Sequence, residues 1–513
     1  MIGLIGIVLS LLLLIFFAYR GVNVIILAPL AALYATAFAG GLPLLATYTQ
    51  VFMPALGKYL ITYFPLFLLG AIFGKLMSDS GAARVIAIFI AEKLGGSRAI
   101  LAIVLACGIL TYGGVSLFVV AFAIFPIAAA LFREAQVPKR LIPATIGLGS
   151  FTFTMTALPG TPQIQNAIPA PFFGTNAFAA PGLGIIAGLI MFAGGTAWLM
   201  FRANRLAAAG EGYLDKSAPP TPLGARASKR GSSDSDTGAG SGGTSAGRSP
   251  GAATDQLEEV EEVEPETLPE EDAATNTAVA PPSVLVALLP IILVIALNYA
   301  LVTWVFPAMD TDYLSQEAYG KTDIETVGGI WAIVAALVAS SLLILALNYK
   351  RFLDAKGTVN EGTFSSFLPI LNTASEVGYG AVVASLPAFK TIRDSVLGVS
   401  GNPVISLAVA VNVLAGITGS ASGGMSIALE TLGERFRELA EEQNISLELM
   451  HRVTTLASGG FDALPHNGAV ITLLAICGLT HRQSYKDIFM VAVAIPVLAL
   501  VVVVILGSLF GGF

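Results

Sequence analysis

Charged residues are scarce in this sequence. Only 12% of its 513 residues are Asp, Glu, Lys or Arg, roughly half the share found in soluble globular domains. The mean hydropathy is high, at +0.79, and apolar runs at 4–17, 22–37 and 491–506 approach or reach the roughly 20 residues that cross a bilayer as a helix. These runs are continuous rather than alternating, which excludes a transmembrane β-barrel. We therefore expect an all-α polytopic membrane protein.

Cysteine is also rare. Cys107 and Cys477 lie far apart in apolar segments, so neither a disulfide framework nor a metal-ligand spacing is present. The first apolar run lacks the basic residues that precede the apolar part of a signal peptide, and we interpret it as a retained helix. The sequence has no HExxH motif, phosphate-binding loop or nucleophile elbow. We therefore expect no enzyme activity, no cofactor and no bound metal.

Acidic side chains are concentrated in one segment. Residues 203–282 carry 14 acidic and 6 basic side chains, whereas the rest of the chain carries 20 and 21. This segment combines a Gly/Ser-rich stretch with an acidic run that has no Lys or Arg. Such a composition buries too little apolar surface to offset the entropy of ordering. We predict a disordered linker between membrane halves 1–202 and 283–513, and a regulatory tail is the less favoured alternative.

The two halves resemble each other. "TALPGTPQ" in the first half corresponds to "DALPHNGA" in the second, and "TYGGVS" corresponds to "TGSASGG". Corresponding features lie about 304 to 307 positions apart, in the same order. This pattern indicates an internal duplication.

Loop charge predicts that the duplication is inverted. The loop 133–140 is basic, whereas its counterpart 434–452 is mainly acidic. Because basic loops prefer the cytoplasm, the two copies should face opposite sides. Inverted repeats are typical of transporters, with the substrate near the midplane. For the basic loop to lie inside, the Gly-rich stretch before it must fold back as a re-entrant hairpin.

Each half is therefore expected to contain the same series of segments. These are two spans (2–19 and 22–39; 283–306 and 327–348), a third span (60–77; 364–385), a re-entrant hairpin (98–132; 402–433), a broken transmembrane helix (141–173; 453–479) and a final span (181–202; 487–508).

Polar interruptions in the apolar segments point to a binding site. Irregular backbone at membrane depth persists only where it is buried in protein or lines a wet cavity. The two "ALP" motifs add prolines, which break helices. Four breaks at matched positions indicate one shared cavity, and helix N-termini there would favour an anion. Close helix packing is the alternative, but it does not account for prolines beside Gln, Asn and His.

Ionisable side chains in apolar surroundings are candidates for proton coupling, because they typically mark ion or substrate pathways. Asp462 and His466 lie four residues apart across a proline, and histidine titrates near neutral pH. Asp462 has an alternative role as a helix cap. Glu376, apolar on both sides, is the second carboxylate candidate; its alternative role is a carboxyl group at a cavity rim.

Other charged residues are predicted to have no role in transport. Lys75 and Asp79 fall at the cytoplasmic end of a span, where a snorkelling pair is expected. His451 and His481 fall in segments that we interpret as polar loops.

The motifs "LPGTPQIQN", "NTASEVGYGAVV", "GITGSASGGMSIALE" and "SGGFDALPHNGAVITLL" resemble those of the gluconate:proton symporter (gluconate permease) family, in the ion transporter superfamily. The resemblance covers both halves and not the linker. It implies two re-entrant hairpins, two broken helices and a homodimer. It also implies import of gluconate, other sugar acids, hydroxybutyrate or D-serine across the inner membrane. The implied binding residues are Thr111, Tyr112, Gly113, Gly114, Ser116, Gly160, Thr161, Gln163, Asn166, Thr418, Gly419, Ser420, Ser422, Gly423, His466 and Asn467.

The hypothesis from the sequence is a secondary active transporter that imports a small hydroxylated monocarboxylate by proton symport. Asp462, His466 and Glu376 are its candidate coupling residues. The linker should be cytoplasmic, and the expected partners are the substrate, the proton and the lipid bilayer, with no nucleic acid. A sodium-coupled carboxylate carrier is the alternative, and a passive anion channel is a third possibility.

Overall fold

The computed structural model describes residues 2–19, 22–40, 42–213, 279–465 and 467–513. His466 and most of the predicted linker lie outside this part of the chain. The described residues form helices and contain no β-strand, which confirms the all-α prediction.

Among the described residues, the first half contains eleven α-helices besides the short α3 (Leu44–Thr47). Their bounds are α1 (Ile2–Tyr19), α2 (Val24–Ala39), α4 (Met53–Asp79), α5 (Ala82–Leu94), α6 (Ala99–Tyr112), α7 (Leu117–Glu134), α8 (Ile142–Phe151), α9 (Phe153–Thr156), α10 (Ile164–Ala167), α11 (Ala170–Phe173) and α12 (Pro181–Ala208).

The second half follows the same order. Its helices are α13 (Val284–Ala300), α14 (Ile324–Asn348), α15 (Ala355–Ser385), α16 (Phe389–Leu397), α17 (Pro403–Thr418), α18 (Ala421–Glu442), α19 (Leu447–Ser458), α20 (Gly468–Cys477), α21 (His481–Phe489) and α22 (Ile495–Phe510).

Several helices are long and apolar enough to cross a membrane, which makes the chain a multi-pass membrane protein. Within the described ranges there are six: Leu44–Asp79, Leu117–Glu134, Pro181–Ala208, Val284–Ala308, Ile324–Arg351 and His481–Phe510. A seventh span is possible where Leu447–Ala463 and Gly468–Cys477 meet at a bend of 54°.

The helix boundaries differ from the predicted ones in places. Helix α12 continues to Ala208, six residues into the range assigned to the linker. Helix α4 begins at Met53 and α15 at Ala355, each before the predicted start of the third span. Helix α7 is long enough to cross a membrane by itself, whereas α6 is a shorter apolar helix. The predicted hairpin 98–132 therefore consists of two unequal helices.

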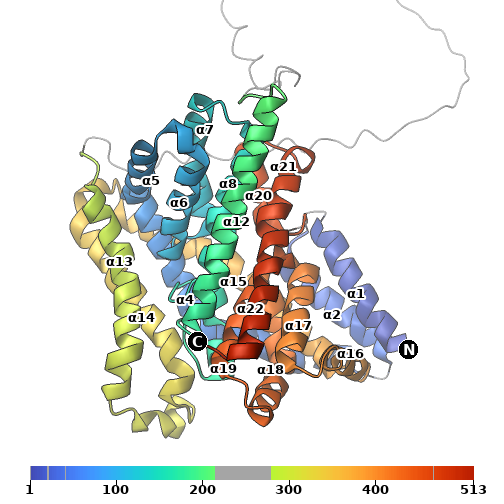
Figure 1. The fold of residues 1–513 in the computed structure, drawn as a ribbon. Helices are drawn as coiled ribbons and strands as arrows, with labels where there is room; N and C mark the ends of the chain where they lie inside the picture. Colours follow the sequence, from blue (N-terminus) through green and yellow to red (C-terminus); the bar gives the residue numbers. More distant parts are fainter. Residues whose placement is uncertain (1, 20–21, 41, 214–278, 466) are drawn as a thin grey trace, which may run out of the picture. The chain divides into compact units, whose positions relative to one another are not determined.

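The two halves also share their packing partners (Figure 1). Helix α6 packs against α7 and α8, and α17 packs against α18 and α19. Helices α4 and α15 pack against each other; α2 then contacts α15, and α14 contacts α4. Helices α12 and α22, which end the two halves, lie side by side. Each half therefore contributes to the surroundings of the other.

Proline and glycine explain where the long helices bend and stop. Pro65 lies inside α4 and Pro369 lies inside α15, and an interior proline removes one backbone hydrogen bond. Gly114 has a φ of +97° after α6, and Gly419 has a φ of +63° after α17. These angles favour glycine, so both Gly-rich motifs reverse the chain between paired helices.

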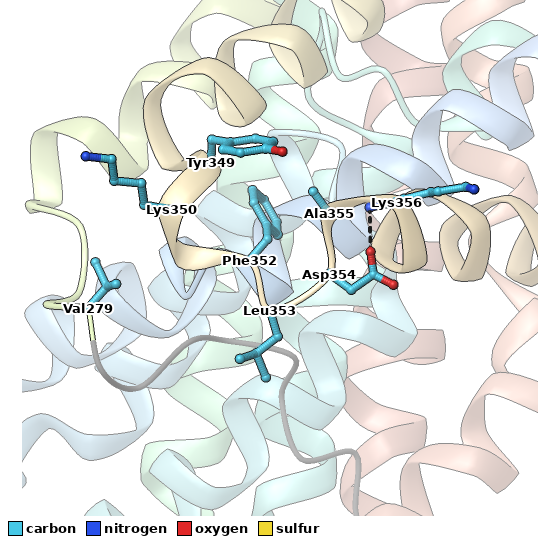
Figure 2. Close-up of a pocket in the computed structure, with 8 residues that line it drawn as sticks. All are labelled: Val279, Tyr349, Lys350, Phe352, Leu353, Asp354, Ala355 and Lys356. Carbon is cyan, nitrogen blue, oxygen red and sulfur yellow. Dashed lines mark hydrogen bonds between the residues drawn. The ribbon is translucent and has the colours of Figure 1, made fainter.

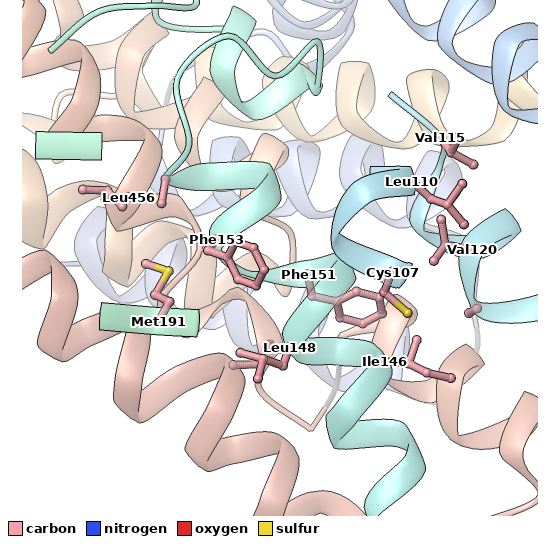
Figure 3. Packing of buried hydrophobic residues seen from close by; sticks show 14 of the residues in the cluster. Cys107, Leu110, Val115, Val120, Ile146, Leu148, Phe151, Phe153, Met191 and Leu456 are labelled. Atoms are coloured by element: carbon pink, nitrogen blue, oxygen red, sulfur yellow. The ribbon is translucent and has the colours of Figure 1, made fainter. Parts of the chain in front are cut away.

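Small residues allow close packing beside the first of these turns. A side chain at Gly149 of α8 would come within 2.6 Å of Cys107 Cβ and of the Val104 carbonyl oxygen in α6. Figure 3 shows Cys107 beside the ring of Phe151 across this interface, while Leu110 lies near Val115 and Val120. Membrane helices that approach this closely depend on small residues, and here they allow α8 to pack directly against α6.

Candidate functional site: two helix breaks and two Gly-rich turns

The first break is the stretch of non-helical backbone between α9 and α10. Gly160 lies in its centre with a φ of +80°, and its backbone N–H donates to the Ala177 carbonyl at 2.8 Å. The ring of Phe178 occupies the space that a side chain at Gly160 would need. Both the backbone angle and the packing therefore require glycine here.

The first break is hydrogen bonded to the first Gly-rich turn. The Gln163 amide Nε2 donates to the Thr111 carbonyl at 2.8 Å and to the Val115 carbonyl at 3.4 Å. The Tyr112 hydroxyl donates to the Pro159 carbonyl at 2.7 Å. Two predicted site residues thus hold the break and the turn together.

The second half has the same kind of connection. Asn467 Nδ2 donates to the Gly419 carbonyl at 2.8 Å, and its Oδ1 accepts from the Val470 backbone N–H at 2.8 Å to begin α20. Ser420 Oγ accepts from the Gly423 backbone N–H at 3.0 Å and caps α18. In both halves an amide side chain from a break donates to a carbonyl at a Gly-rich turn.

The two breaks approach each other. A side chain at Gly459, just before the second break, would lie 2.7 Å from Thr156 Cγ2 at the start of the first. Helices α10 and α11 pack against α18 and α19, and the ring of Phe172 faces Gly433 of α18. The structure therefore brings the first break beside the helix that begins at the second Gly-rich turn.

Glu376 lies at the second Gly-rich turn. Its side chain is buried, with 5% exposure, and its Oε2 fills the space beside Gly423. The Ser420 hydroxyl lies within reach of the same carboxyl group. No hydrogen-bond donor to Glu376 Oε2 is found among the described residues. One carboxylate oxygen is therefore enclosed in the protein without a partner there.

Further polar atoms near this turn are weakly bonded. Asn372, one turn before Glu376 on α15, has an Oδ1 without a partner in the described residues. The hydroxyls of Thr373 and Ser422 lie 3.5 Å apart, and Thr418 Oγ1 donates to the Leu414 carbonyl at 2.9 Å. Polar groups from α15 and from the turn thus face one another.

Asp462 lies in the part of the second break that contacts α21. It is half-buried within a single 3₁₀ turn, Phe461–Ala463. The Tyr485 hydroxyl donates to the Ala463 carbonyl at 3.1 Å, and His481 Nε2 lies 2.9 Å from the Pro465 carbonyl oxygen. The turn that carries Asp462 is therefore held against α21. His481, predicted to have no role, contributes to this contact.

Several predicted site residues of the first half are enclosed. Asn166 is fully buried; its Nδ2 donates to the Thr161 carbonyl at 3.2 Å and to the Ala177 carbonyl at 2.8 Å. The hydroxyls of Thr111 and Thr161 are buried and lack partners among the described residues. In this conformation Asn166 shapes the first break, while the two threonine hydroxyls retain free hydrogen-bonding capacity.

The interpretation of His451 as a polar-loop residue is wrong. His451 and Arg452 are fully buried in α19, and His451 Nδ1 lies 2.7 Å from Thr175 Oγ1. The spacing between the two halves could have indicated that these residues are helical, because 306 positions earlier lie Thr145 and Ile146, in the middle of α8. Charge and polarity alone had placed both residues in a loop.

Lys75 and Asp79 form the predicted pair and also connect two helices. Asp79 is buried and accepts a hydrogen bond from the Thr358 hydroxyl at 2.8 Å. Lys75 Nζ lies 3.4 Å from Asp79 Oδ1 and 2.9 Å from Glu361 Oε2. These contacts join α4 to α15, which the sequence did not predict.

Two cavities are found away from the breaks. One lies at the loop between α14 and α15, where Tyr349, Lys350, Phe352 and Asp354 surround it together with Val279 (Figure 2). The other is an apolar groove between α4 and α15, beside the stacked rings of Phe64 and Phe367. Neither is lined by a predicted site residue, so the shared cavity at the breaks stays a prediction.

Comparison with known proteins shows the family. Residues 1–204 match the GntP family permeases. Over 515 residues, 99% of each chain, the sequence is 41% identical to YxjC, an uncharacterized transporter of Bacillus subtilis strain 168. The chain belongs to the GntP permease family. A shorter region of 149 residues is 36% identical to an uncharacterized transporter of Haemophilus influenzae, covering 29% of this chain and 33% of that protein.

Membership of the GntP family confirms the resemblance found in the motifs at the turns and breaks. It makes the chain a multi-pass membrane transporter with a small-molecule substrate.

Proposed function

We propose that this GntP family permease imports a small hydroxylated monocarboxylate, such as gluconate, another sugar acid or hydroxybutyrate, by proton symport. Family membership supports a gluconate-like substrate class. Entry of an anion with one proton is electrically neutral, so the proton concentration difference drives accumulation. The protein acts in the cytoplasmic membrane, as a homodimer.

The proposed architecture is a pair of inverted repeats, 1–202 and 283–513, joined by a cytoplasmic linker at 203–282. The repeated order of helices and of packing partners supports the duplication, and the opposite loop charges support the inversion. Helix pairs α6–α7 and α17–α18 are the re-entrant hairpins. Helices α8–α11 and α19–α20 are the broken helices.

The substrate binds where the Gly-rich turns and breaks meet. Helices α18 and α20 begin there, capped by Ser420 and Asn467, and the N–H groups of a helix N-terminus favour a carboxylate. Thr111, Thr161 and Ser422 bind the substrate hydroxyls; the hydroxyls of Thr111 and Thr161 have no hydrogen-bond partner in the described part of the chain. Tyr112, Gln163 and Asn166 hold the backbone around them through their side chains.

Glu376 is the observation that supports proton coupling best. Its Oε2 is buried against Gly423, without a hydrogen-bond partner among the described residues. Carboxyl groups enclosed at membrane depth typically mark proton or ion pathways. Any movement of the turn changes the surroundings of this carboxyl group, which links its protonation to the conformation of the substrate site. Asp462 and His466 remain the other coupling candidates.

Uptake into proteoliposomes tests the function. The purified protein is reconstituted and offered radiolabelled gluconate, 3-hydroxybutyrate and D-glycerate under an imposed pH gradient or an imposed sodium gradient. We expect accumulation with the pH gradient alone. Accumulation that requires sodium would replace the proton as the coupling ion, and equilibration without accumulation would identify a channel.

A further inference from the structure

Arg452 makes the most extensive set of side-chain hydrogen bonds at the first break. Its side chain is fully buried in α19. Nε donates to the Ala179 carbonyl at 3.0 Å, and Nη2 donates to the same carbonyl at 2.7 Å and to the Ala177 carbonyl at 3.3 Å. Nη1 donates to the Ala157 carbonyl at 3.2 Å and to Asn166 Oδ1 at 3.1 Å. One side chain thus binds both ends of the first break.

The acceptors around Arg452 are all uncharged. No carboxylate among the described residues lies within ion-pair distance of the guanidinium group. Glu448, one turn earlier on α19, is directed to the neighbouring Ala180 backbone N–H at 3.3 Å. Carbonyl dipoles therefore satisfy the donors of Arg452 while its positive charge is retained.

Helix α12 packs closely against this hydrogen-bond network at Gly184. A side chain at Gly184 of α12 would lie 3.2 Å from Arg452 Nε and 2.5 Å from the Ala157 carbonyl oxygen. A guanidinium group has five donors in a fixed plane, which suits several carbonyls at once, whereas the lysine ammonium group is compact and cannot span them.

Arg452 belongs to the second half, and its acceptors belong to the first. The position 306 residues earlier is Ile146, buried and apolar in α8. The position that corresponds to Arg452 in the first half therefore carries no charge, and the two proposed repeats differ at this point.

We propose that Arg452 is the positioning residue of the first break, which it holds against α19 while keeping a fixed positive charge beside the bound anion. The five hydrogen bonds set the path of residues 157–179, and so place Thr161 and Gln163 next to the first turn. The buried charge attracts a carboxylate over several ångströms, because screening is weak inside the protein. The part of the proposal that concerns a bound anion rests on the proposed function, whereas the positioning of the first break does not.

Hydrogen–deuterium exchange tests the positioning without any substrate. The full-length protein is compared in nanodiscs with Arg452→Gln, Arg452→Lys and a matched control, Arg202→Gln. Arg202 is a partly buried arginine that pairs with Asp487, and among the described residues it forms no hydrogen bond with either break. In Arg452→Gln, amides of 157–180 should exchange roughly tenfold faster or more, while peptides at 459–470 keep their rates. Arg452→Lys should accelerate the same peptides less.

Two results would contradict the positioning role. One is unchanged exchange at 157–180 in a folded Arg452→Gln protein. The other is an equal acceleration of exchange at both breaks in Arg452→Gln, with the same distribution along the chain as in Arg202→Gln. That result would show that Arg452 contributes only to general stability. If Arg452→Gln does not fold, Arg452→Lys decides between these outcomes, since it retains the charge.

Binding measurements separate the effect of the Arg452 charge from the effect of its shape. Calorimetry with D-gluconate and with uncharged D-gluconamide measures Kd for the same proteins. The Kd for gluconate should rise at least about tenfold in Arg452→Gln and much less in Arg452→Lys, with gluconamide binding changed equally in both. Equal Kd values for gluconate in the wild type, Arg452→Gln and Arg452→Lys would refute the role of the charge. A wild-type protein that binds neither probe would count against the proposed substrate, and the exchange result would still decide the positioning.

Discussion

The first and second breaks occupy corresponding places in the two proposed repeats, yet they are held in different ways. Arg452, Asn166 and Gln163 bind the first break with a network that involves α6, α19 and its own backbone. The second break is attached more simply, by Asn467 to the turn and by Tyr485 to α21. The permanent cation serves the first break, while the candidate proton carriers lie in the second half. The two breaks therefore differ in the side chains that hold them, although the motifs around them are alike.

The largest expected effect follows from removing the buried carboxylate of the second half. Glu376→Gln keeps the shape of the side chain and cannot release a proton, so gradient-driven accumulation should fall to the level of protein-free liposomes. Exchange of labelled for unlabelled substrate should continue, because it does not require net proton movement. Glu361→Gln, an exposed change on the same helix, is the control. Normal accumulation in Glu376→Gln would transfer the coupling role to Asp462 or His466.

Gly423 tests whether the turn and the carboxylate must touch. In Gly423→Ala the new methyl group would overlap Glu376 Oε2, so the turn or the carboxylate must move. We expect a loss of about 1–3 kcal/mol in stability and a severalfold loss of transport. Gly468→Ala, where no atom lies within 4 Å of the added carbon, should transport normally. Equal activity of the two variants would show that the contact with Glu376 is unimportant.

The amide contacts allow the two halves to be compared directly. Gln163→Ala leaves the Thr111 carbonyl without its side-chain donor, and Asn467→Ala does the same at Gly419. Each loss should cost about 1–3 kcal/mol. Asn467→Ala also removes the cap of α20, worth about 1 kcal/mol more, so its thermal unfolding temperature should be the lower one. The reverse order would mean that the first break depends more on its turn than the second does.

The smallest effect is expected at Asp462. This residue is half-buried beside α21 and not at the Gly-rich turn, so Asp462→Asn should reduce uptake less than Glu376→Gln does in the same assay. His466→Gln, measured in parallel, completes the set of coupling candidates. If Asp462→Asn abolished accumulation while exchange continued, the coupling residue would lie at the second break itself.

The sequence located the turns and breaks because glycine and proline act on their own stretch of backbone. Gly114, Gly419 and the prolines of the two "ALP" motifs act on their own backbone, so the turns and breaks could be located without knowledge of the fold. The link between break and turn in each half also agrees with the duplication, because Gln163 and Asn467 stand in the paired motifs.

The sequence missed the features that depend on contacts between segments distant along the chain. Arg452 and His451 are polar by composition, and only the carbonyls and hydroxyl that surround them in the fold allow them to be buried. The contact between Glu376 and Gly423 joins two helices that are separate in sequence.

The burial of both native thiols has a practical consequence. Cys107 packs closely against Gly149, and Cys477 is equally inaccessible, so membrane-impermeant maleimides should leave the unmodified protein unlabelled. Single cysteines introduced along α7 can then be read against a silent background, with no need for a cysteine-free parent. Labelling of both ends of α7 from one face of the membrane would establish a re-entrant loop, and labelling from opposite faces would establish a full crossing.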